Sequence, residues 1–170
     1  KCLVIQGARQ TGKTYIVERF AEENYEEIIE INFKQMPSAM EIFSGDLTVD
    51  AMVMGMRFRF PEKKIIPGKT LIFLDEIQKC EKFSEVIDSL YIKKNVDIYI
   101  TGSNAYLLST EFSTLLSGRY VEIRVLPLSF KEFLDFYEFA PDVTMDEKFQ
   151  KYLQFGGMPI LREYKFNEAR

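Results

Sequence analysis

An eight-residue segment near the start of the chain constrains the fold more than any other feature. Residues 7–14 fit the phosphate-binding loop pattern G-x-x-x-x-G-K-[ST] at every fixed position. An apolar run at residues 1–5 precedes the segment, and a helical pattern follows in which Ile16, Val17 and Phe20 share a face. This strand, loop and helix context favours a phosphate site over a glycine turn that happens to precede a helix.

The residue types of this loop suit a nucleotide with Mg²⁺. Glycines at both ends let backbone N–H groups approach phosphate oxygens, and the next helix directs its positive end at the same anion. We expect Lys13 to contact the β- and γ-phosphates of ATP and the Thr14 hydroxyl to ligate Mg²⁺. The expected ATP or ADP contacts are Gly7, Ala8, Arg9, Gln10, Thr11, Gly12, Lys13 and Thr14.

Two carboxylates end a second apolar strand. Residues 71–74 are Leu-Ile-Phe-Leu, and Asp75 and Glu76 follow at once. A buried strand of a parallel sheet would deliver Asp75 to the edge where the phosphate loop lies. Asp75 is then expected to hold Mg²⁺, and Glu76 to orient and deprotonate the water that attacks the γ-phosphate. The alternative is an acidic pair that caps the next helix or faces solvent.

A third apolar strand ends in small polar residues. Residues 98–100 are Ile-Tyr-Ile, and Thr-Gly-Ser-Asn follows. Ser103 or Asn104 would position the attacking water or sense the γ-phosphate if this strand lies beside the magnesium site. An ordinary turn with Asn104 as a helix cap explains the same residues equally well.

The order of these elements predicts one α/β domain with a helical appendage. Strands are expected at residues 1–5, 28–31, 70–74, 98–100 and 120–125, with helical spacing at residues 83–92. Alternating strands and helices imply parallel pairing, and hence a three-layer P-loop sandwich with a five-stranded parallel sheet. We place this core at residues 1–127 and a small helical lid at 128–170. Residues 35–64 are expected to be helical in part and carry no recognisable chemistry.

Composition narrows the class of protein further. A chain of 170 residues with a formal charge of −4 has no whole-chain basic field that attracts nucleic acid, although a local basic patch stays compatible with it. Two isolated cysteines and no histidine exclude a familiar zinc site and favour a reduced, cytoplasmic protein. No apolar run has the roughly 20 residues of a membrane helix. A soluble protein with no membrane contact is expected.

Several short blocks together resemble an AAA+ ATPase. More narrowly, they resemble a prokaryotic family of AAA-type ATPases that carries a C-terminal domain of unknown function. Besides the phosphate loop, the blocks are Leu-Asp-Glu-Ile-Gln at 74–78, Thr-Gly-Ser at 101–103, Gly-Arg at 118–119, Pro-Leu-Ser-Phe-Lys-Glu-Phe at 127–133 and Gly-Gly-Met-Pro at 156–159.

The resemblance implies further roles. Arg119 corresponds to the arginine finger that stabilises charge on the γ-phosphate bound by a neighbouring subunit, which implies a homo-oligomer. An ion pair within its own chain is the alternative for Arg119. Met-Pro occupies the turn where a lid arginine normally follows, and Arg162 is the nearest candidate. Only six residues precede Gly7, so we expect a fragment of a longer protein whose C-terminal effector domain the ATPase drives.

Two other classes of function fit parts of the pattern. A small-molecule kinase would keep the phosphate loop but needs an arginine-rich lid, and the Asp-Glu strand end counts against it. A GTPase is disfavoured because the chain has no Asn-Lys-x-Asp motif. A nucleotide-dependent binding or assembly module with negligible hydrolysis stays open, because its catalytic positions can all be intact.

The phosphate loop generates the first prediction. The folded chain should bind ATP or ADP with Mg²⁺, and Lys13→Ala should abolish that binding because the loop loses its full positive charge. Isothermal titration calorimetry measures both affinities. Equal affinity of the variant and the parent would show that residues 7–14 are not the nucleotide site.

Overall fold

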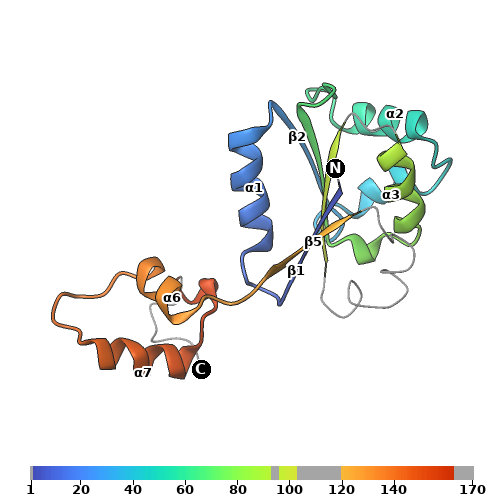
Figure 1. The fold of residues 1–170 in the computed structure, drawn as a ribbon. Coiled ribbons are helices and arrows are strands. Elements are labelled where there is room, and N and C mark those ends of the chain that lie inside the picture. The colour runs from blue at the N-terminus through green and yellow to red at the C-terminus, as the bar shows by residue number, and fades with distance from the viewer. Residues whose placement is uncertain (1, 93–95, 103–119, 163–170) are drawn as a thin grey trace. The chain divides into compact units, whose positions relative to one another are not determined.

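A five-stranded parallel sheet organises the structure. The computed structural model describes residues 2–92, 96–102 and 120–162. The strands are β1 (Cys2–Gly7), β2 (Glu27–Asn32), β3 (Thr70–Asp75), β4 (Asp97–Thr101) and β5 (Val121–Val125). They lie in the order β2-β3-β4-β1-β5 (Figure 1). The predicted α/β class with a parallel sheet is therefore confirmed.

Strand β3 lies in the interior of this sheet, and all six of its residues are buried. It pairs in parallel with β2 on one side, where Asn32 stands opposite Asp75, and with β4 on the other, where Leu74 stands opposite Ile100. A strand covered on both faces must be apolar throughout, which is why its sequence does not alternate. Parallel pairing also brings the carboxyl ends of β2, β3 and β4 to one edge.

Helices cover both faces of the sheet. In Figure 1, α1 (Lys13–Asn24) lies on one side of the strands, whereas α2 (Val49–Arg59) and α3 (Phe83–Ile92) lie on the other. The expected face of α1 is only partly right. Val17 and Ala21 are buried, but Ile16 and Phe20 are 48% and 44% exposed. The two buried positions stand at i and i+4, on one line along the helix. The buried stripe is therefore narrower than the sequence spacing suggested.

The stretch at residues 35–64 contributes part of the core. The 3-10 helix η1 (Pro37–Phe43) precedes α2, which begins after Thr48, whose side chain accepts a hydrogen bond from the Ala51 amide. Met52 and Met56 on α2 are completely buried in the main hydrophobic cluster. The short 3-10 helix η2 (Ile77–Lys79) links β3 to α3. Flexible methionine side chains fill the irregular space between α2 and the sheet.

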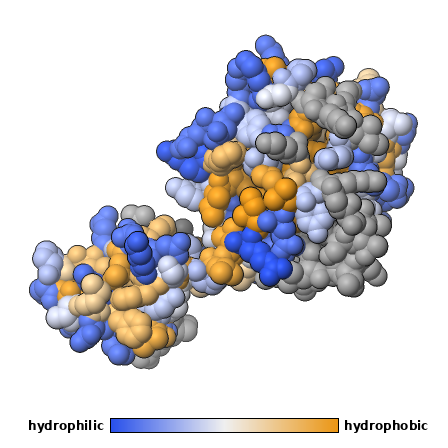
Figure 2. Space-filling model, in the orientation of Figure 1, coloured by the Kyte–Doolittle hydropathy of each residue, from blue (hydrophilic) through white to orange (hydrophobic). Residues whose placement is uncertain are grey.

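The outer strand β5 carries apolar side chains on its surface. Val121 and Ile123 are 60% and 43% exposed, and hydrophobic colour gathers over this strand in Figure 2. Exposed apolar side chains on an edge strand are typical of surfaces that another chain covers.

The chain divides into two compact units. Residues Lys1–Gln6 and Lys13–Arg124 form the first, and Gly7–Gly12 with Val125–Arg170 form the second. The second unit contains α6 (Phe130–Phe136), α7 (Met145–Phe155) and the 3-10 helix η3 (Pro159–Arg162). Of the helices in the described part of the chain, none combines the length and hydrophobicity of a membrane span.

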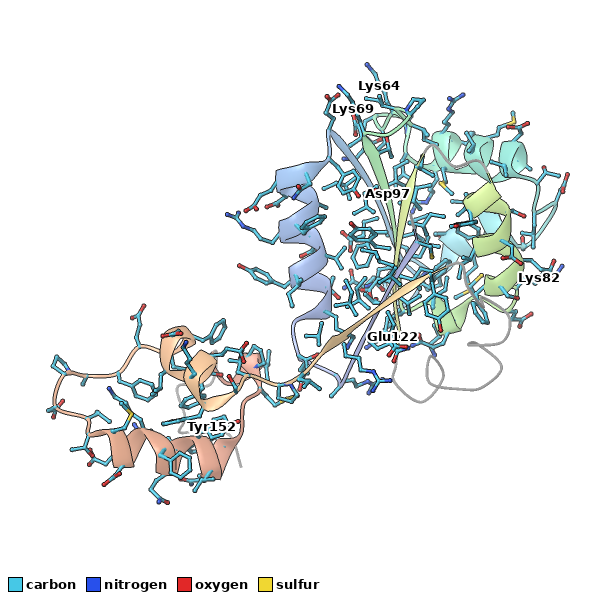
Figure 3. All side chains as sticks on the ribbon, in the orientation of Figure 1. Lys64, Lys69, Lys82, Asp97, Glu122 and Tyr152 are labelled. Carbon is cyan, nitrogen blue, oxygen red and sulfur yellow. The ribbon has the colours of Figure 1, made fainter. Side chains whose placement is uncertain are left out.

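Two capping boxes and a small aromatic core stabilise the helices of the second unit. The caps are Ser129 with Glu132 in α6 and Thr144 with Glu147 in α7. Hydrogen bonds from the Ser129 hydroxyl and then its amide lower the pKa of Glu132. Those from the Thr144 amide and then its hydroxyl lower the pKa of Glu147. Phe133 is completely buried among neighbouring aromatic rings. The Tyr152 hydroxyl donates to the Leu128 carbonyl at 3.0 Å (Figure 3).

Two methionines of α2 provide a matched test of the core. Met56→Ala should lower the free energy of unfolding by about 2–5 kcal/mol because it leaves a cavity in the main cluster. Met54 is 75% exposed on the same helix, so Met54→Ala should change stability by less than about 0.5 kcal/mol. Urea titration followed by circular dichroism measures both. Equal losses in the two variants would contradict the assigned orientation of α2.

Candidate functional site

The carboxylate of Asp75 is the centre of the site. It lies at the end of β3, is 5% exposed and accepts four hydrogen bonds. Asn32 Nδ2 donates to Oδ2 at 2.7 Å, and the Thr14 hydroxyl donates to the same oxygen at 3.3 Å. The Thr101 hydroxyl and the Glu76 amide, the latter at 3.1 Å, donate to Oδ1. These donors compensate the loss of hydration, so a buried negative charge can persist here.

The side-chain amide of Asn32 is fixed in one orientation. Its Oδ1 accepts hydrogen bonds from the backbone amides of Lys34 and Gln35, at 3.0 and 2.9 Å. The carbonyl end of the amide is therefore engaged, and only the NH₂ end can face Asp75. The Phe33 amide also donates to the Asp75 carbonyl, so the chain leaving β2 is fastened to the end of β3. Asn32 thus acts as a fixed donor to the Asp75 carboxylate.

Lys13 and Thr14 are the first two residues of α1. Their position puts both side chains at the positive end of the helix, where an anion such as phosphate is favoured. Thr14 also contacts Asp75, so the hydroxyl and the carboxylate expected to share Mg²⁺ are adjacent. Mg²⁺ in phosphate sites uses one or two protein oxygens together with phosphates and water. The donor set of Thr14 and Asp75 fits this requirement.

The described residues contain no group of three acidic, histidine or cysteine side chains that would hold a metal by itself. Mg²⁺ bound by two protein oxygens depends on phosphate for its remaining ligands. A Mg²⁺ ion held by Thr14 and Asp75 would therefore bind together with the nucleotide.

Glu76 adopts an uncommon backbone conformation. Its φ of 57° and ψ of 43° lie in the left-handed region, which costs a non-glycine residue about 1–2 kcal/mol. Gln78 Nε2 donates to the Glu76 carboxylate and holds it in place. Gln10, in the phosphate loop, is the other non-glycine residue with positive φ in the described chain. Such strain is concentrated at functional positions in proteins, and here it occurs in both predicted motifs.

The backbone of the phosphate loop requires glycine at two positions. Gly12 has a φ of 85°, which favours glycine, and the Thr11 hydroxyl donates to the Ala8 carbonyl at 2.9 Å. A Cβ atom on Gly7 would lie 2.3 Å from the Val125 carbonyl oxygen. Glycine at position 7 is therefore required by the close approach of β5 as well as by any phosphate.

Negative charge accumulates near Asp75. Glu30 lies on β2, two residues before Asn32, and burial raises its pKa. The charges of Glu18 and Asp75 raise it further. A bound divalent cation would relieve this repulsion, which favours metal binding at the strand ends.

The structure brings together only some of the predicted residues. Thr14 and Asp75 are in contact, and Glu76 follows directly. Ser103, Asn104 and Arg119 lie outside the described residues, as does the side chain of Arg162.

Sequence reasoning missed two donors to Asp75, namely Asn32 and Thr101. Each is the last residue of its strand, β2 or β4. A polar residue at the end of a largely apolar strand was a signal that could have identified both.

The amino-acid sequence matches a known protein family and two longer relatives. Residues 1–134 match the model of a family described as AAA domain. An uncharacterized protein of Haemophilus influenzae is 37% identical over 167 residues, covering 92% of this chain and 39% of that protein. One from Methanocaldococcus jannaschii is 29% identical over 168 residues, covering 94% of this chain and 36% of that protein. The chain thus spans about two fifths of these relatives.

Solved structures show the same fold at low sequence identity. C. elegans PCH-2 matches with a TM-score of 0.53 and 17% identity, over 85% of this chain and 43% of that one. A katanin structure, described as a basis for self-assembly, matches with a TM-score of 0.56 and 14% identity, over 100% of this chain and 62% of that one. At such identity the likeness extends to the fold alone.

The contact between Asn32 and Asp75 generates a prediction that needs no nucleotide. Asn32→Asp replaces a donor 2.7 Å from Asp75 with a second carboxylate. The free energy of unfolding at pH 7 should fall by at least about 2 kcal/mol because a charged hydrogen bond becomes a repulsion. The repulsion raises one carboxyl pKa in the folded state, so the loss should shrink as pH falls and that group gains a proton.

Urea unfolding at pH 7 and pH 5 measures this loss. Asn24→Asp is the matched control, because Asn24 is exposed and its amide contacts only the Phe20 carbonyl among the described hydrogen bonds. A pH-independent loss in Asn32→Asp, or the same loss in the control, would contradict the assigned contact.

Proposed function

Because the chain belongs to the AAA domain family of P-loop ATPases, we propose that it binds ATP with Mg²⁺ and hydrolyses the β–γ phosphoric anhydride bond. A nucleotide-binding, ATPase-like core follows from the family itself. The observation that carries the proposal of hydrolysis is the contact between Thr14 and Asp75, with Glu76 next in the chain. This arrangement supplies metal ligands and a candidate base at one edge of the sheet.

Each residue has a distinct role in the proposed reaction. The Lys13 ammonium balances negative charge on the phosphates, and the end of α1 supports it. Thr14 and Asp75 would hold Mg²⁺, which would neutralise charge on the phosphate oxygens. Glu76 accepts a proton from water as the water oxygen forms its bond to the γ-phosphorus and the bond to the β–γ bridging oxygen breaks. The products are ADP, phosphate and a proton.

Three residues position this machinery. Asn32 and Thr101 donate to the Asp75 carboxylate and keep it aligned with Thr14. Gln78 donates to Glu76 and fixes the orientation of its carboxylate. A catalytic group held in place before the reaction avoids the energetic penalty of reorganising during it.

Assembly is part of the proposal. Arg119 would act on the nucleotide of a neighbouring copy, which makes hydrolysis depend on oligomerisation. The self-assembly named for the katanin structure supports this, as do the exposed apolar residues of β5. The relatives are more than twice as long as the matched region, which supports a further module driven by the nucleotide cycle.

A substitution at the candidate base tests hydrolysis. Glu76→Gln keeps the shape of the side chain and removes its proton-accepting charge, so kcat should fall by about 10²-fold or more while Mg²⁺-ATP still binds. Asp75→Asn should instead weaken the Mg²⁺ dependence of binding. Single-turnover kinetics over a range of protein concentrations, with calorimetry for affinity, measure these effects and the dependence on assembly.

Glu81→Gln is the matched control, because Glu81 is exposed and follows η2. It should keep the parental rate. If Glu76→Gln also hydrolysed ATP at the parental rate, Glu76 would have no part in the mechanism. A parent that binds nucleotide tightly and never turns it over would favour the nucleotide-dependent assembly module.

A further inference from the structure

A cavity of about 170 Å³ lies among α2, α3 and the sheet, away from the candidate nucleotide site. Val49, Val53 and Arg57 line it from α2, at successive turns of the helix. Ile72 of β3 and Leu90 of α3 lie opposite. The remaining lining residues are Ile65 and Pro67, just before β3, and Val96, just before β4. The cavity therefore lies toward the amino ends of β3 and β4, whereas Asp75 and Thr101 end the same two strands.

The interior of this cavity suits an apolar group. Seven of its eight lining residues are valine, isoleucine, leucine or proline. A cavity of about 150 Å³ with such walls is known to accept benzene, so 170 Å³ can hold one aromatic ring or one branched aliphatic side chain. Burial of a side chain of that size is a common anchor in protein recognition.

The segment that contributes Arg57, Ile65 and Pro67 to the cavity wall is basic. Residues 57–69 contain five lysines and arginines and one acidic residue, for a local charge of +4 in a chain whose total is −4. Lys63 pairs with Glu27 at 3.8 Å and Lys69 pairs with Glu26. Figure 3 shows Lys64 and Lys69 at the same end of the unit.

Three cations of this segment keep their charge available. Arg57, Arg59 and Lys64 form no ion pair with any described residue, although Arg59 lies over the Phe60 ring. Arg57 combines such a cation with a place in the cavity wall. A ligand with an anionic group beside an apolar side chain would pair with Arg57 and fill the cavity at once.

Apolar side chains extend the surface beside the cavity. Met54 and Phe58, one helical turn apart on α2, are 75% and 89% exposed, whereas Met52 and Met56 are buried beneath them. A helix that is apolar on both its inner and outer faces is usually covered on both. Basic residues that end a helix are explained by the helix dipole, but exposed Met54 and Phe58 are not.

We propose that this surface, made of the cavity with Met54, Phe58, Arg57, Arg59 and Lys64, binds an acidic segment of a partner protein. One aromatic or branched aliphatic side chain of the partner enters the cavity. Carboxylates on either side of that anchor pair with Arg57 and Lys64, and further apolar atoms cover Met54 and Phe58. This interaction site goes beyond ATP hydrolysis and does not require it.

The shape and apolar lining of the site favour a protein segment over nucleic acid. Single-stranded nucleic acid binds along a basic groove in which several aromatic side chains stack on successive bases. Here Phe58 is the one strongly exposed aromatic side chain of α2, and the cavity beside it is a partly open apolar pocket rather than a flat stacking face. A methionine next to Phe58 also suits apolar side chains better than bases.

The test uses a fluorescently labelled peptide, Glu-Glu-Phe-Glu-Glu, and the protein labelled at its valine, isoleucine and leucine methyl groups. Addition of the peptide to millimolar concentration should shift the methyl NMR signals of Val53 and Ile72. Fluorescence anisotropy should show an affinity about tenfold or more weaker when the central Phe is replaced by Ser, because the anchor is lost. The peptide change leaves the fold of the protein untouched.

Variants of the protein test the basic residues of this surface. Arg57→Glu and Lys64→Glu should each weaken binding about tenfold, and added salt should weaken it in the parent. Lys82→Glu is the matched control, because Lys82 is exposed and precedes α3, two helical turns from Leu90. Its affinity should stay within about twofold of the parent.

Several results would overturn the proposal. One is the absence of methyl shifts at millimolar peptide, and another is equal affinity for the Phe and Ser peptides. Equal weakening by Lys82→Glu and Arg57→Glu would show that binding follows total charge alone. Binding of oligothymidylate that Arg57→Glu abolishes, without binding of the peptide, would assign the surface to single-stranded nucleic acid.

Discussion

The buried carboxylate of Asp75 is the group on which the rest of the site depends. A negative charge at 5% exposure is tolerated only when donors replace its hydration. Those donors come from α1, β2 and β4 and from the backbone that follows β3. The side chain therefore joins four parts of the chain at one point. A change in the order or register of β2, β3 and β4 would remove the hydrogen bonds from Asn32 and Thr101.

The apolar core holds the end of β3, where Asp75 lies, in a fixed position. Strand β3 is buried along its whole length, and α2 and α3 pack on one face of the sheet while α1 covers the other. Closely packed interiors do not deform continuously, so the end of β3 has little freedom to move. Against this fixed frame, the left-handed conformation of Glu76 places its carboxylate beside Gln78 instead of continuing the strand. Packing of the core thus fixes the position from which Glu76 follows Asp75.

The first unit has two chemically different ends. At the carboxyl ends of the strands, Asp75 and its neighbour Glu30 create an acidic environment that suits a cation and its phosphates. At the amino ends, an apolar cavity lined in part by Arg57 and by the basic segment 57–69 suits an acidic partner. The hydrophobic core separates these two ends of the unit. One domain can therefore present two surfaces that attract opposite charges, one at Asp75 and one at Arg57.

The sequence by itself determined the strand, loop and helix at residues 1–24, the five-stranded parallel class and the Asp-Glu strand end. These features are contiguous in sequence, and glycine, lysine and carboxylate at fixed spacing carry their own chemistry. Only the tertiary structure decided that Asn32 and Thr101 hold Asp75, that Ile16 and Phe20 stay exposed, and that Arg57 lines a cavity with Ile72. Each of these depends on strand register or helix packing between distant residues, which local patterns do not specify.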